Sequence, residues 1–293
     1  MTKSPLDAAA AAAWIREGIE AYGASPENRL RSGEDHEPAW GKPLVGFSRG
    51  DDPLFDFFKE QIGPFCWTPA EVFAATFPAV PVRPAELTVI SWILPQTVAT
   101  SRENAREKTL PADRWCHSRK YGEAFNSRMR DHVVALLTAA GYQAVAPVRS
   151  PLWKKETSAR YGFASRWSER HAAYASGLGT FGLCDGLITP VGKAMRCGSA
   201  VARIIAAPTE RPYVDHRAYC LFFADGSCGK CISRCPAKAI SPTGHDKEAC
   251  AAYVHRVARP SVQERFGFEA DACGLCQTGV PCAEKIPVPG IAG

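Results

Sequence analysis

The chain has 293 residues, of which 46% are hydrophobic and 22% charged, and it carries a formal net charge of +5. These proportions are typical of a soluble globular protein, and the length suits two domains. No apolar stretch approaches the roughly 20 residues that a membrane-spanning helix needs. The mild positive charge comes without a basic run, which favours ordinary solubility over nucleic-acid binding.

The Ala-rich segment 7–14 predicts an N-terminal helix. It runs directly into Arg16 and Glu17, and it lacks the basic start and the cleavage site of a secretory signal peptide. The helix is expected to begin at Ser4-Pro5, with proline at its first position, and to end at Gly23. Since the sequence also lacks a twin-arginine export signal, we expect a cytoplasmic protein, in which thiols stay reduced.

A loop and two helices are expected next. Residues 24–45 are polar and rich in Gly, Pro and Glu, which is typical of a loop. A second helix is expected over residues 52–61. Residues 68–71, Thr-Pro-Ala-Glu, have the sequence of a capping box and begin a short helix that ends near Phe77.

A buried strand and a long helix follow. The apolar run LTVISWIL, residues 87–94, is rich in β-branched side chains and predicts a buried strand that ends at Pro95. The clearest helix is expected between Trp115 and Ala140, with Gly141 as its stop. Its apolar side chains repeat every four residues, at Tyr121, Phe125, Met129, Val133 and Leu137.

The rest of the first part mixes strands with one more helix. A strand is expected over residues 144–148 and a helix over residues 165–176. Two strands, 187–189 and 199–206, are expected around a Gly-Lys turn at residues 192–193. A proline-bounded segment, residues 208–212, suggests a domain boundary, with domains at 1–210 and 211–293.

Eight of the twelve cysteines lie in the last 74 residues, with spacing typical of two iron–sulfur clusters. Cys235 precedes a proline, and in two-cluster ferredoxins the cysteine at this place ligates the other cluster. We therefore expect two 4Fe–4S clusters. The first would be held by Cys220, Cys228, Cys231 and Cys282, and the second by Cys235, Cys250, Cys273 and Cys276.

Two gaps in this pattern are longer than in the simple ferredoxin run. Seven residues separate Cys220 from Cys228, and five separate Cys276 from Cys282. Both are insertions in loops, which perturb a fold little. Two zinc sites are the alternative, since C-x2-C pairs also bind zinc, but zinc does not need the C-x3-C-P continuation. The other four cysteines lack ligand spacing, and all of them except Cys184 are expected to be buried apolar side chains: Cys66, Cys116, Cys184 and Cys197.

Residues 177–182, Gly-Leu-Gly-Thr-Phe-Gly, match the letters of the dinucleotide-binding motif. That motif must follow a strand and open a helix, whereas here it follows a predicted helix and leads toward a strand. We therefore reject nicotinamide binding and expect these glycines to let the backbone pack closely against a flat ligand or a helix.

The chain resembles epoxyqueuosine reductases in a series of motifs. They are the pair Glu169-Arg170, residues 177–182, residues 187–190 (Leu-Ile-Thr-Pro) and the cysteines that follow. They resemble reductive dehalogenases more distantly. The similarity covers about residues 85–285 and is strongest over residues 165–285. It implies an α+β protein, in which a nitroreductase-like α/β domain that binds cobalamin is followed by a ferredoxin-like domain with two 4Fe–4S clusters. In such proteins the clusters reduce the cobalt, and the reduced corrinoid acts on the substrate.

The chain departs from this family in two ways. The family's acidic proton donor, within a D-T-x-P segment, aligns with Phe163. The C-terminal repeats that bind tRNA in the family are not expected, because the chain ends about ten residues after Cys282. We therefore expect a different substrate, with tRNA possible but not favoured. The missing twin-arginine signal argues against respiratory dehalogenation.

With the family aspartate absent, the candidate proton donors are Tyr121, Glu169 and Tyr174, with His171 as a further candidate. For Tyr121 the alternative is core packing, for Glu169 a solvated position, and for His171 a structural role. The resemblance implies that Cys184, Leu187 and Gly198 approach the corrinoid. Arg119 and Arg170 are further cofactor-binding candidates, and Lys120 and Arg196 could also hold amide or phosphate groups of a corrinoid.

The sequence is compatible with three functions. The first is a cobalamin-dependent iron–sulfur reductase that acts on an epoxide or another carbon–heteroatom bond, with reduced ferredoxin or flavodoxin as its electron donor. The second is an electron-transfer protein that reductively activates another corrinoid protein. The third is a flavin-dependent reductase on the same fold.

Overall fold

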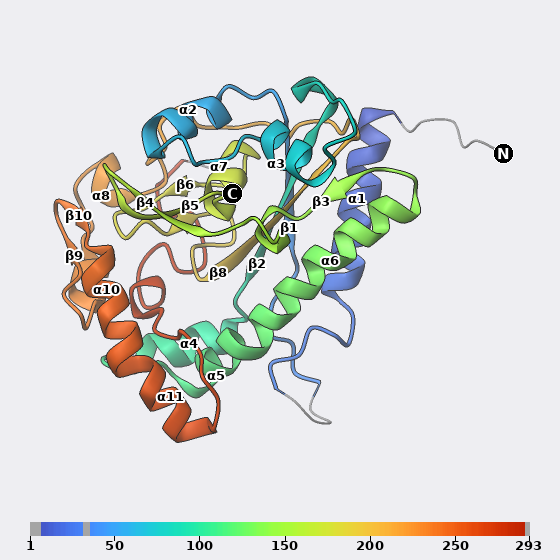
Figure 1. Ribbon diagram of the computed structural model, residues 1–293. Helices are drawn as coiled ribbons and strands as arrows, with labels where there is room; N and C mark the ends of the chain where they lie inside the picture. Colours follow the sequence, from blue (N-terminus) through green and yellow to red (C-terminus); the bar gives the residue numbers. More distant parts are fainter. Residues whose placement is uncertain (1–6, 32–35, 291–293) are drawn as a thin grey trace.

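A four-stranded antiparallel sheet lies at the centre of the molecule, with helices on both of its faces (Figure 1). The computed structural model describes residues 7–31 and 36–290. The strand order is β1-β2-β8-β3, and these strands span Leu44–Arg49, Thr88–Pro95, Met195–Ala202 and Ala144–Val145. β2 and β8 pair along their whole length, from Thr88 opposite Ala202 to Pro95 opposite Met195. The mixture of helix and sheet expected from the sequence is confirmed.

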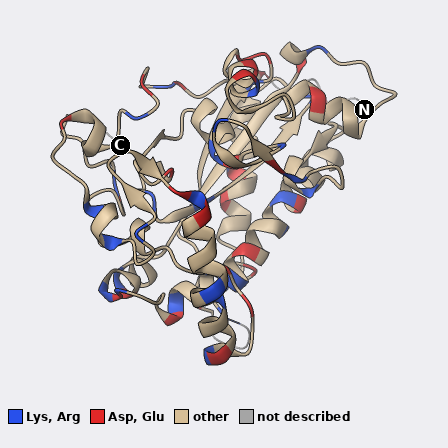
Figure 2. Ribbon diagram, turned by 60° about the vertical axis from the view of Figure 1, so that its left-hand side comes forward, with Lys and Arg blue, Asp and Glu red and all other residues tan. Residues whose placement is uncertain are grey.

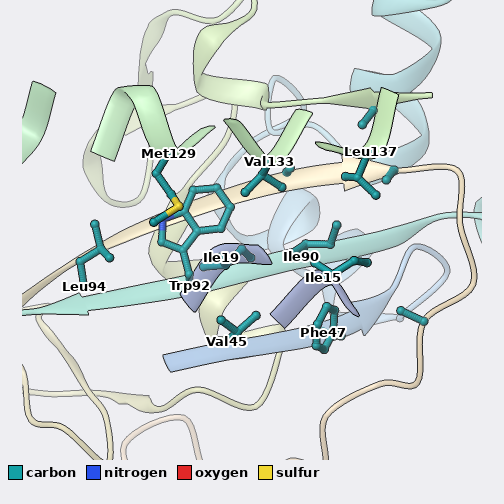
Figure 3. Packing of buried hydrophobic residues seen from close by; sticks show 14 of the residues in the cluster. Ile15, Ile19, Val45, Phe47, Ile90, Trp92, Leu94, Met129, Val133 and Leu137 are labelled. Atoms are coloured by element: carbon teal, nitrogen blue, oxygen red, sulfur yellow. The ribbon is translucent and has the colours of Figure 1, made fainter. Parts of the chain in front are cut away.

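One face of the sheet is covered by α1 (Ala8–Gly23) and α6 (Glu123–Ala139). The predicted four-residue repeat is confirmed from Phe125 onward, since the side chains of Phe125, Met129, Val133 and Leu137 are fully buried, whereas Tyr121 is only half-buried. They meet apolar side chains of α1, β1 and β2 in one cluster (Figure 3), which includes Ile15, Ile19, Val45, Phe47, Ile90 and Trp92.

The first helix begins after Asp7, whose carboxylate accepts a hydrogen bond from the backbone N–H of Ala10 at 2.7 Å. An aspartate at this position satisfies one of the free N–H groups of the first turn. The helix ends at Gly23, as predicted. Ser4 and Pro5, where the sequence places its start, lie outside the described residues.

The opposite face of the sheet is covered by α2 (Leu54–Ile62), α3 (Pro69–Thr76) and α7 (Glu169–Ala175). Side chains of β2 alternate between the two clusters, because successive residues of a strand point to opposite faces. Ile90 and Trp92 join the first cluster, whereas Val89 and Ile93 join the second. The expectation of a strand buried on both faces is therefore confirmed.

The predicted capping box is present at the start of α3. The hydroxyl of Thr68 accepts a hydrogen bond from the backbone N–H of Glu71, and the Glu71 carboxylate accepts one from the backbone N–H of Thr68. These two bonds satisfy two N–H groups that a helix start leaves unpaired.

The helix predicted over residues 115–140 is interrupted. The helix α5 (Asp113–His117) leads into a π-helical turn, Ser118–Gly122, which then continues as α6. The indole N–H of Trp40 donates a hydrogen bond to the Gly122 carbonyl at 2.9 Å. A π-helical turn redirects backbone carbonyls out of the regular helical ladder, and here the Trp40 indole takes up one of them.

Several predicted boundaries change because of strand pairing. The helix predicted over residues 165–176 begins only at Glu169, since β5 (Gly162–Ser165) pairs with β4 (Lys155–Ser158). The strand predicted over residues 199–206 spans 195–202 instead. The two strands around the Gly-Lys turn do not pair, because β7 (Leu187–Ile188) pairs with β6 (Thr180–Phe181).

The sequence also predicted the ends of two strands wrongly. The expected loop 24–45 contains the start of β1, which the sequence analysis missed. The strand predicted over residues 144–148 is limited to β3, because Pro147 begins a short 3-10 turn that ends at Arg149.

The C-terminal part of the chain is built from short elements joined by loops. It packs beside α4 (Val98–Arg106) and α5, and Figure 1 shows α10 and α11 next to these two helices. Its elements are α8 (Leu221–Ala224), α9 (Lys230–Arg234), β9 (Ile240–Ser241), β10 (Gly244–His245), α10 (Lys247–Tyr253) and α11 (Arg259–Phe266). Residues 203–220 contain no helix or strand, and a domain boundary within them stays a prediction.

Basic and acidic residues are both spread over the surface helices (Figure 2). Among the helices of the described chain, none is long and apolar enough to cross a membrane.

Candidate functional site

A buried core rich in sulfur lies where the C-terminal part of the chain meets the turns after α7. It contains Cys184, Cys220, Cys231 and Cys282, together with apolar side chains that include Leu183, Ile188, Tyr219 and Val280. Cys235 and Cys276 pack at its edge. Three cysteines expected at the first cluster therefore share one core with Cys184, which the sequence analysis did not count as a ligand.

Short helices and turns place these sulfurs. Cys220 caps α8, and its carbonyl accepts the backbone N–H of Ala224 at 2.9 Å. Cys231 lies within α9, and Cys235 follows the end of that helix. The backbone N–H of Ala239 donates to the Cys235 sulfur at 3.3 Å. Hydrogen bonds of this kind to a ligand sulfur are one of the ways in which a protein sets the potential of an iron–sulfur cluster.

The four cysteines expected at the first cluster lie around one small pocket. Its lining includes Cys220, Cys228, Cys231 and Cys282, together with the buried Lys193. Three distant segments of the chain contribute these side chains, so the pocket exists only in the folded protein.

The cysteines expected at the second cluster are also neighbours. The pKa of the Cys273 thiol is raised to about 11, mainly by burial and in smaller part by the nearby Cys250 and Cys235. Cys276 lies close enough to Cys273 to interact with it electrostatically, and its thiol is also within hydrogen-bonding reach of the Cys184 sulfur. The two sets of cysteines are thus adjacent.

A polar side chain fixes the loop that carries Cys273 and Cys276. The Arg234 guanidinium donates to the carbonyls of Leu275 and Thr278, each at 3.1 Å. It also donates to the carbonyls of Glu107 and Asn104, at 2.7 and 3.2 Å. Arg234 therefore ties α9, the cysteine loop and the end of α4 together.

These residues fit the donor chemistry of two four-iron clusters, since the ligands of such clusters are cysteine thiolates and the eight cysteines lie in two neighbouring sets. Within residues 7–31 and 36–290, no three His, Cys, Asp or Glu side chains are grouped so that they could hold a single metal ion. The cluster ligands and the zinc alternative both stay predictions.

Cys184 and Lys193 form a buried pair inside the sulfur-rich core. The Lys193 ammonium donates to the Cys184 sulfur at 3.2 Å. Cys231 and Cys276 also lie within hydrogen-bonding reach of the Cys184 sulfur. The sequence analysis noted Lys193 only as part of a turn. A lysine in a buried, otherwise apolar segment was the signal that could have found it.

The residues expected to face a corrinoid are covered by the protein itself. Leu187 is fully buried in the second apolar cluster. Gly198 lies against Trp92, and a Cβ at position 198 would come within 2.3 Å of the indole ring. Cys184 is covered by sulfurs and Lys193. These side chains do not enclose a space for a large ring, so they do not fit a bound corrinoid in this arrangement.

Glu169 belongs to a buried polar network. Its carboxylate accepts a hydrogen bond from Arg130 at 2.9 Å and another from the Ser199 hydroxyl. Burial raises the pKa of Glu169, although Arg130 and Ser199 act against this. The network continues through Asn126, which accepts a hydrogen bond from the Trp92 indole at 3.0 Å. Glu169 thus has internal partners, and its role as a proton donor stays a prediction.

Sequence reasoning missed Asn126 and Arg130. Both are buried polar residues on α6, four positions apart, and therefore lie on the same face of the helix. Their amide and guanidinium groups both donate to the Cys197 carbonyl, at 2.9 and 3.1 Å. The spacing of polar residues within the predicted helix was a signal that could have found them.

The two tyrosines proposed as proton donors lie in different surroundings. Tyr121 is half-buried in the π-helical turn, with its ring centroid 5.8 Å from that of Phe268 and 6.1 Å from that of His117. Tyr174 is buried in α7 among aromatic rings, and burial raises its pKa. Tyr121, Glu169 and Tyr174 thus have separate sets of neighbours, and their catalytic roles stay predictions.

The remaining candidates make ordinary internal contacts. Arg119 donates to the Asp271 carbonyl at 2.9 Å and pairs with Glu123 at 3.1 Å. Arg170 donates to the Asp185 carbonyl. His171 bonds to the Ser168 hydroxyl at 2.7 Å, and burial lowers the pKa of its ring to about 3. Both arginines stay predicted cofactor-binding residues.

The glycines after α7 allow close contact between backbone segments. Gly177 and Gly179 have positive φ angles, of +77° and +156°. A Cβ on Gly179 would come within 2.2 Å of the Ile188 carbonyl oxygen. The motif follows a helix and leads into a strand, as predicted.

A large groove opens beside Cys228. Its volume is about 910 Å³, and α4, the loop that carries Cys228 and residues 279–285 line it. Three cationic side chains border it, Arg102, Lys230 and Lys285, against a single carboxylate, that of Glu284. The half-buried Cys228 is the only predicted cluster ligand among its lining residues. The groove thus links a predicted ligand to solvent.

Comparison with known proteins shows similarity of fold. No protein-family model matches the chain, and no curated protein matches its sequence. A catabolic reductive dehalogenase in complex with 3-bromo-4-hydroxybenzoic acid has a TM-score of 0.52 at 15% identity, over 94% of this chain and 37% of that chain. A reductive dehalogenase whose structure suggests a mechanism for B12-dependent dehalogenation has a TM-score of 0.50 at 14% identity, with the same coverage.

An epoxyqueuosine reductase from Bacillus subtilis has a TM-score of 0.43 at 17% identity, over 85% of this chain and 66% of that chain. The chain thus spans about two thirds of this reductase and 37% of the dehalogenases. At these identities the match to the dehalogenases means that the chain shares their fold across most of its length.

Proposed function

We propose that the chain is an iron–sulfur oxidoreductase that carries electrons through two 4Fe–4S clusters to an acceptor. The observation that carries this proposal is the position of the eight C-terminal cysteines. They form two adjacent sets, one around a small pocket and one around Cys273. Clusters held by these thiolates would supply one-electron transfer.

The chain's own residues have three tasks in this function. The cysteines would hold the clusters, and α9 with Arg234 fixes the loops that carry them. The sulfur-rich core excludes water from Cys220, Cys231 and Cys282, because apolar side chains such as Leu183 and Val280 surround them. The backbone N–H of Ala239 stabilises negative charge on the Cys235 sulfur.

The groove beside Cys228 is the proposed docking site of the electron donor. Arg102, Lys230 and Lys285 give its rim a positive charge. A small acidic carrier such as reduced ferredoxin or flavodoxin complements this charge, and electrostatic attraction speeds the encounter of such partners. A donor seated there would bring its redox centre close to the set that contains Cys228.

The second candidate function is that of a cobalamin-dependent reductase acting on an epoxide or another carbon–heteroatom bond. The shared fold with a dehalogenase described as B12-dependent favours it. The expected corrinoid-facing residues do not fit the ring here, because Leu187 is fully buried and Trp92 fills the space beside Gly198. We therefore derive no step through a corrinoid. Activation of another corrinoid protein and binding of a flavin remain the alternatives for the acceptor.

Iron and sulfide analysis of anaerobically purified protein tests the main proposal. We expect about eight iron and eight sulfide per chain, as two four-iron clusters require. Zinc without sulfide would overturn the proposal. Titration with cobalamin then separates the candidates for the acceptor. A saturable change in the corrinoid absorbance spectrum would support the corrinoid reductase, and an unchanged spectrum would exclude it.

A further inference from the structure

We infer that Lys193 and Cys184 form a built-in charged contact that raises the reduction potential of the iron–sulfur clusters in this chain. The inference rests on the proposed function and concerns two residues outside the eight-cysteine pattern.

The backbone holds Lys193 against the C-terminal cysteine segment. Its N–H donates to the Cys282 carbonyl at 2.9 Å, and the next N–H, of Ala194, donates to the Ala283 carbonyl at 3.1 Å. The preceding Gly192 has a φ of +81°, and a Cβ there would come within 2.1 Å of the Ala283 carbonyl oxygen. The turn before Lys193 thus allows the two segments to meet without a gap.

The Lys193 side chain then points into the sulfur-rich core. The residue is only 3% exposed, and its ammonium lies 3.2 Å from the Cys184 sulfur. Lys193 also lines the small pocket around which Cys220, Cys228, Cys231 and Cys282 lie. Within the described part of the chain, no ion pair joins Lys193 to a carboxylate.

A buried cation without a carboxylate needs another source of negative charge. Removing a charge from water costs several kcal/mol unless a partner compensates for it. A four-iron cluster with four thiolate ligands carries net negative charge, and its reduction adds one more electron. An anionic iron–sulfur centre would therefore supply the negative charge that the buried Lys193 ammonium needs.

Cys184 extends this contact to both sets of cysteines. It shares the buried core with Cys231, expected at the first cluster, and Cys276, expected at the second, packs against that core. It lies on the turn between β6 and β7 and is 6% exposed. Cys184 thus accepts the hydrogen bond from Lys193 and contacts one predicted ligand of each cluster.

A fixed positive charge next to a cluster favours the reduced state over the oxidised state, because the reduced state has one more negative charge. Net charge and hydrogen bonds to the sulfurs are among the features that set the potentials of such clusters. Burial strengthens the effect, since the interaction between charges is stronger away from water. Lys193 therefore makes the clusters easier to reduce, and Cys184 holds its ammonium group inside the core that contains the ligand sulfurs.

The test compares Lys193→Met with Lys230→Met in anaerobic redox titrations followed by electron paramagnetic resonance. Lys230 is on α9 next to Cys231, but it is exposed, so the control removes the same charge where water and salt screen it. For Lys193→Met we expect full iron content and a reduction equilibrium constant at least about tenfold less favourable, which is about 59 mV for a one-electron couple. For Lys230→Met we expect a much smaller change.

A potential that does not move in Lys193→Met, with iron content intact, would overturn the inference and leave the proposed function standing. Iron absent from the unmodified protein would overturn both. Lys193→Arg retains the charge and should recover most of the lost potential. If Lys193→Arg and Lys193→Met lower the potential equally, the charge of Lys193 does not set the potential and the inference fails.

Cys184→Ala is compared with Cys197→Ala, because Cys197 is also buried but its sulfur contacts that of Met195, at 3.6 Å. We expect both variants to retain their iron and only Cys184→Ala to lower the potential. Loss of about four iron atoms in Cys184→Ala alone would mean that Cys184 is itself a ligand, and would overturn its role as a hydrogen-bonding neighbour.

Discussion

Trp92 on β2 and Gly198 on β8 lie opposite each other in the central sheet, and the indole of Trp92 occupies the space that a side chain at position 198 would need. The indole N–H reaches Asn126 on α6, so the ring is held on both sides. The absence of a side chain at Gly198 therefore allows the large Trp92 ring to pack closely against the backbone of β8.

Gly198→Ala should lower the free energy of unfolding by about 1–3 kcal/mol, because the added methyl group overpacks the contact with the indole. Urea denaturation measures the change. The smaller ring of Trp92→Phe leaves room, so the same Ala substitution should cost less in that background. Equal costs in the two backgrounds would show that Trp92 is not what requires glycine at this position.

Glu169→Gln should change how stability depends on pH. Burial raises the folded-state pKa of Glu169 above its ordinary value of 4.5, so folding binds this proton more tightly. Its contribution is fully present below pH 4.5 and is lost as the pH rises through the folded-state pKa. The stability of the unmodified protein relative to Glu169→Gln should therefore fall as the pH rises from 4.5 toward neutrality.

Glu86→Gln is the matched control for this pH effect. The backbone N–H of Arg83 and the side chain of Arg203 hold the pKa of Glu86 below its ordinary value. Its contribution is present at neutral pH and is lost as the pH falls, which is the opposite slope. Thermal or urea unfolding over a pH series measures both variants. Slopes of the same sign would contradict the assignment for Glu169.

Arg234→Lys should loosen the loop that carries Cys273 and Cys276. The guanidinium donates to four carbonyls on the cysteine loop and α4, and a lysine cannot make this planar set of bonds. We expect a loss of roughly 1–3 kcal/mol in the free energy of unfolding. Faster release of iron to a chelator should accompany it.

Arg256→Lys is the control for Arg234→Lys, since Arg256 is an exposed side chain in the same C-terminal part. It should leave both iron release and stability unchanged. A similar rate of iron release in the two variants would show that Arg234 does not hold the cysteine loop in place.

Lys230→Glu combined with Lys285→Glu should slow reduction of the chain by an acidic protein donor. Both side chains border the groove beside Cys228, and reversal of their charge replaces attraction by repulsion. We expect a fall of at least about tenfold in the bimolecular rate at low salt, and a smaller fall at high salt because exposed charges are screened. Anaerobic stopped-flow absorbance measures the rate.

Chemical reduction by dithionite is the internal control for the groove variant. The rate with this small reductant should change far less than the rate with the protein donor. A protein-donor rate that stays the same at low salt would place electron transfer at another surface.

Local patterns in the sequence predicted the elements whose causes lie within a few residues. The capping box at Thr68 and Glu71 needs only the first turn of its helix. The repeat from Phe125 to Leu137 follows from helical periodicity, and the run 87–94 follows from its continuous apolar character. These predictions hold because propensity and packing favour the same structure there.

Elements that depend on distant partners were missed or misplaced. β1 begins in a segment predicted as a loop and was not predicted as a strand, and it is a strand because β2 pairs with it along six residues. The π-helical turn before α6 depends on Trp40, which lies 82 residues earlier than Gly122. The start of α7 shifted because residues 162–165 pair with β4. In each case a long-range contact overrode the local pattern.

The candidate site likewise combines features that the sequence predicted with features that only the tertiary structure decided. The cysteine spacing alone predicted eight thiol ligands in two sets, because tight C-x2-C loops and the C-x3-C-P run restrict where each sulfur can point. The tertiary structure decided that Cys184 and Lys193 join these sulfurs and that Trp92 covers Gly198. Spacing along the chain determines what a short loop can hold, whereas burial and charge compensation depend on which distant segments fold against that loop.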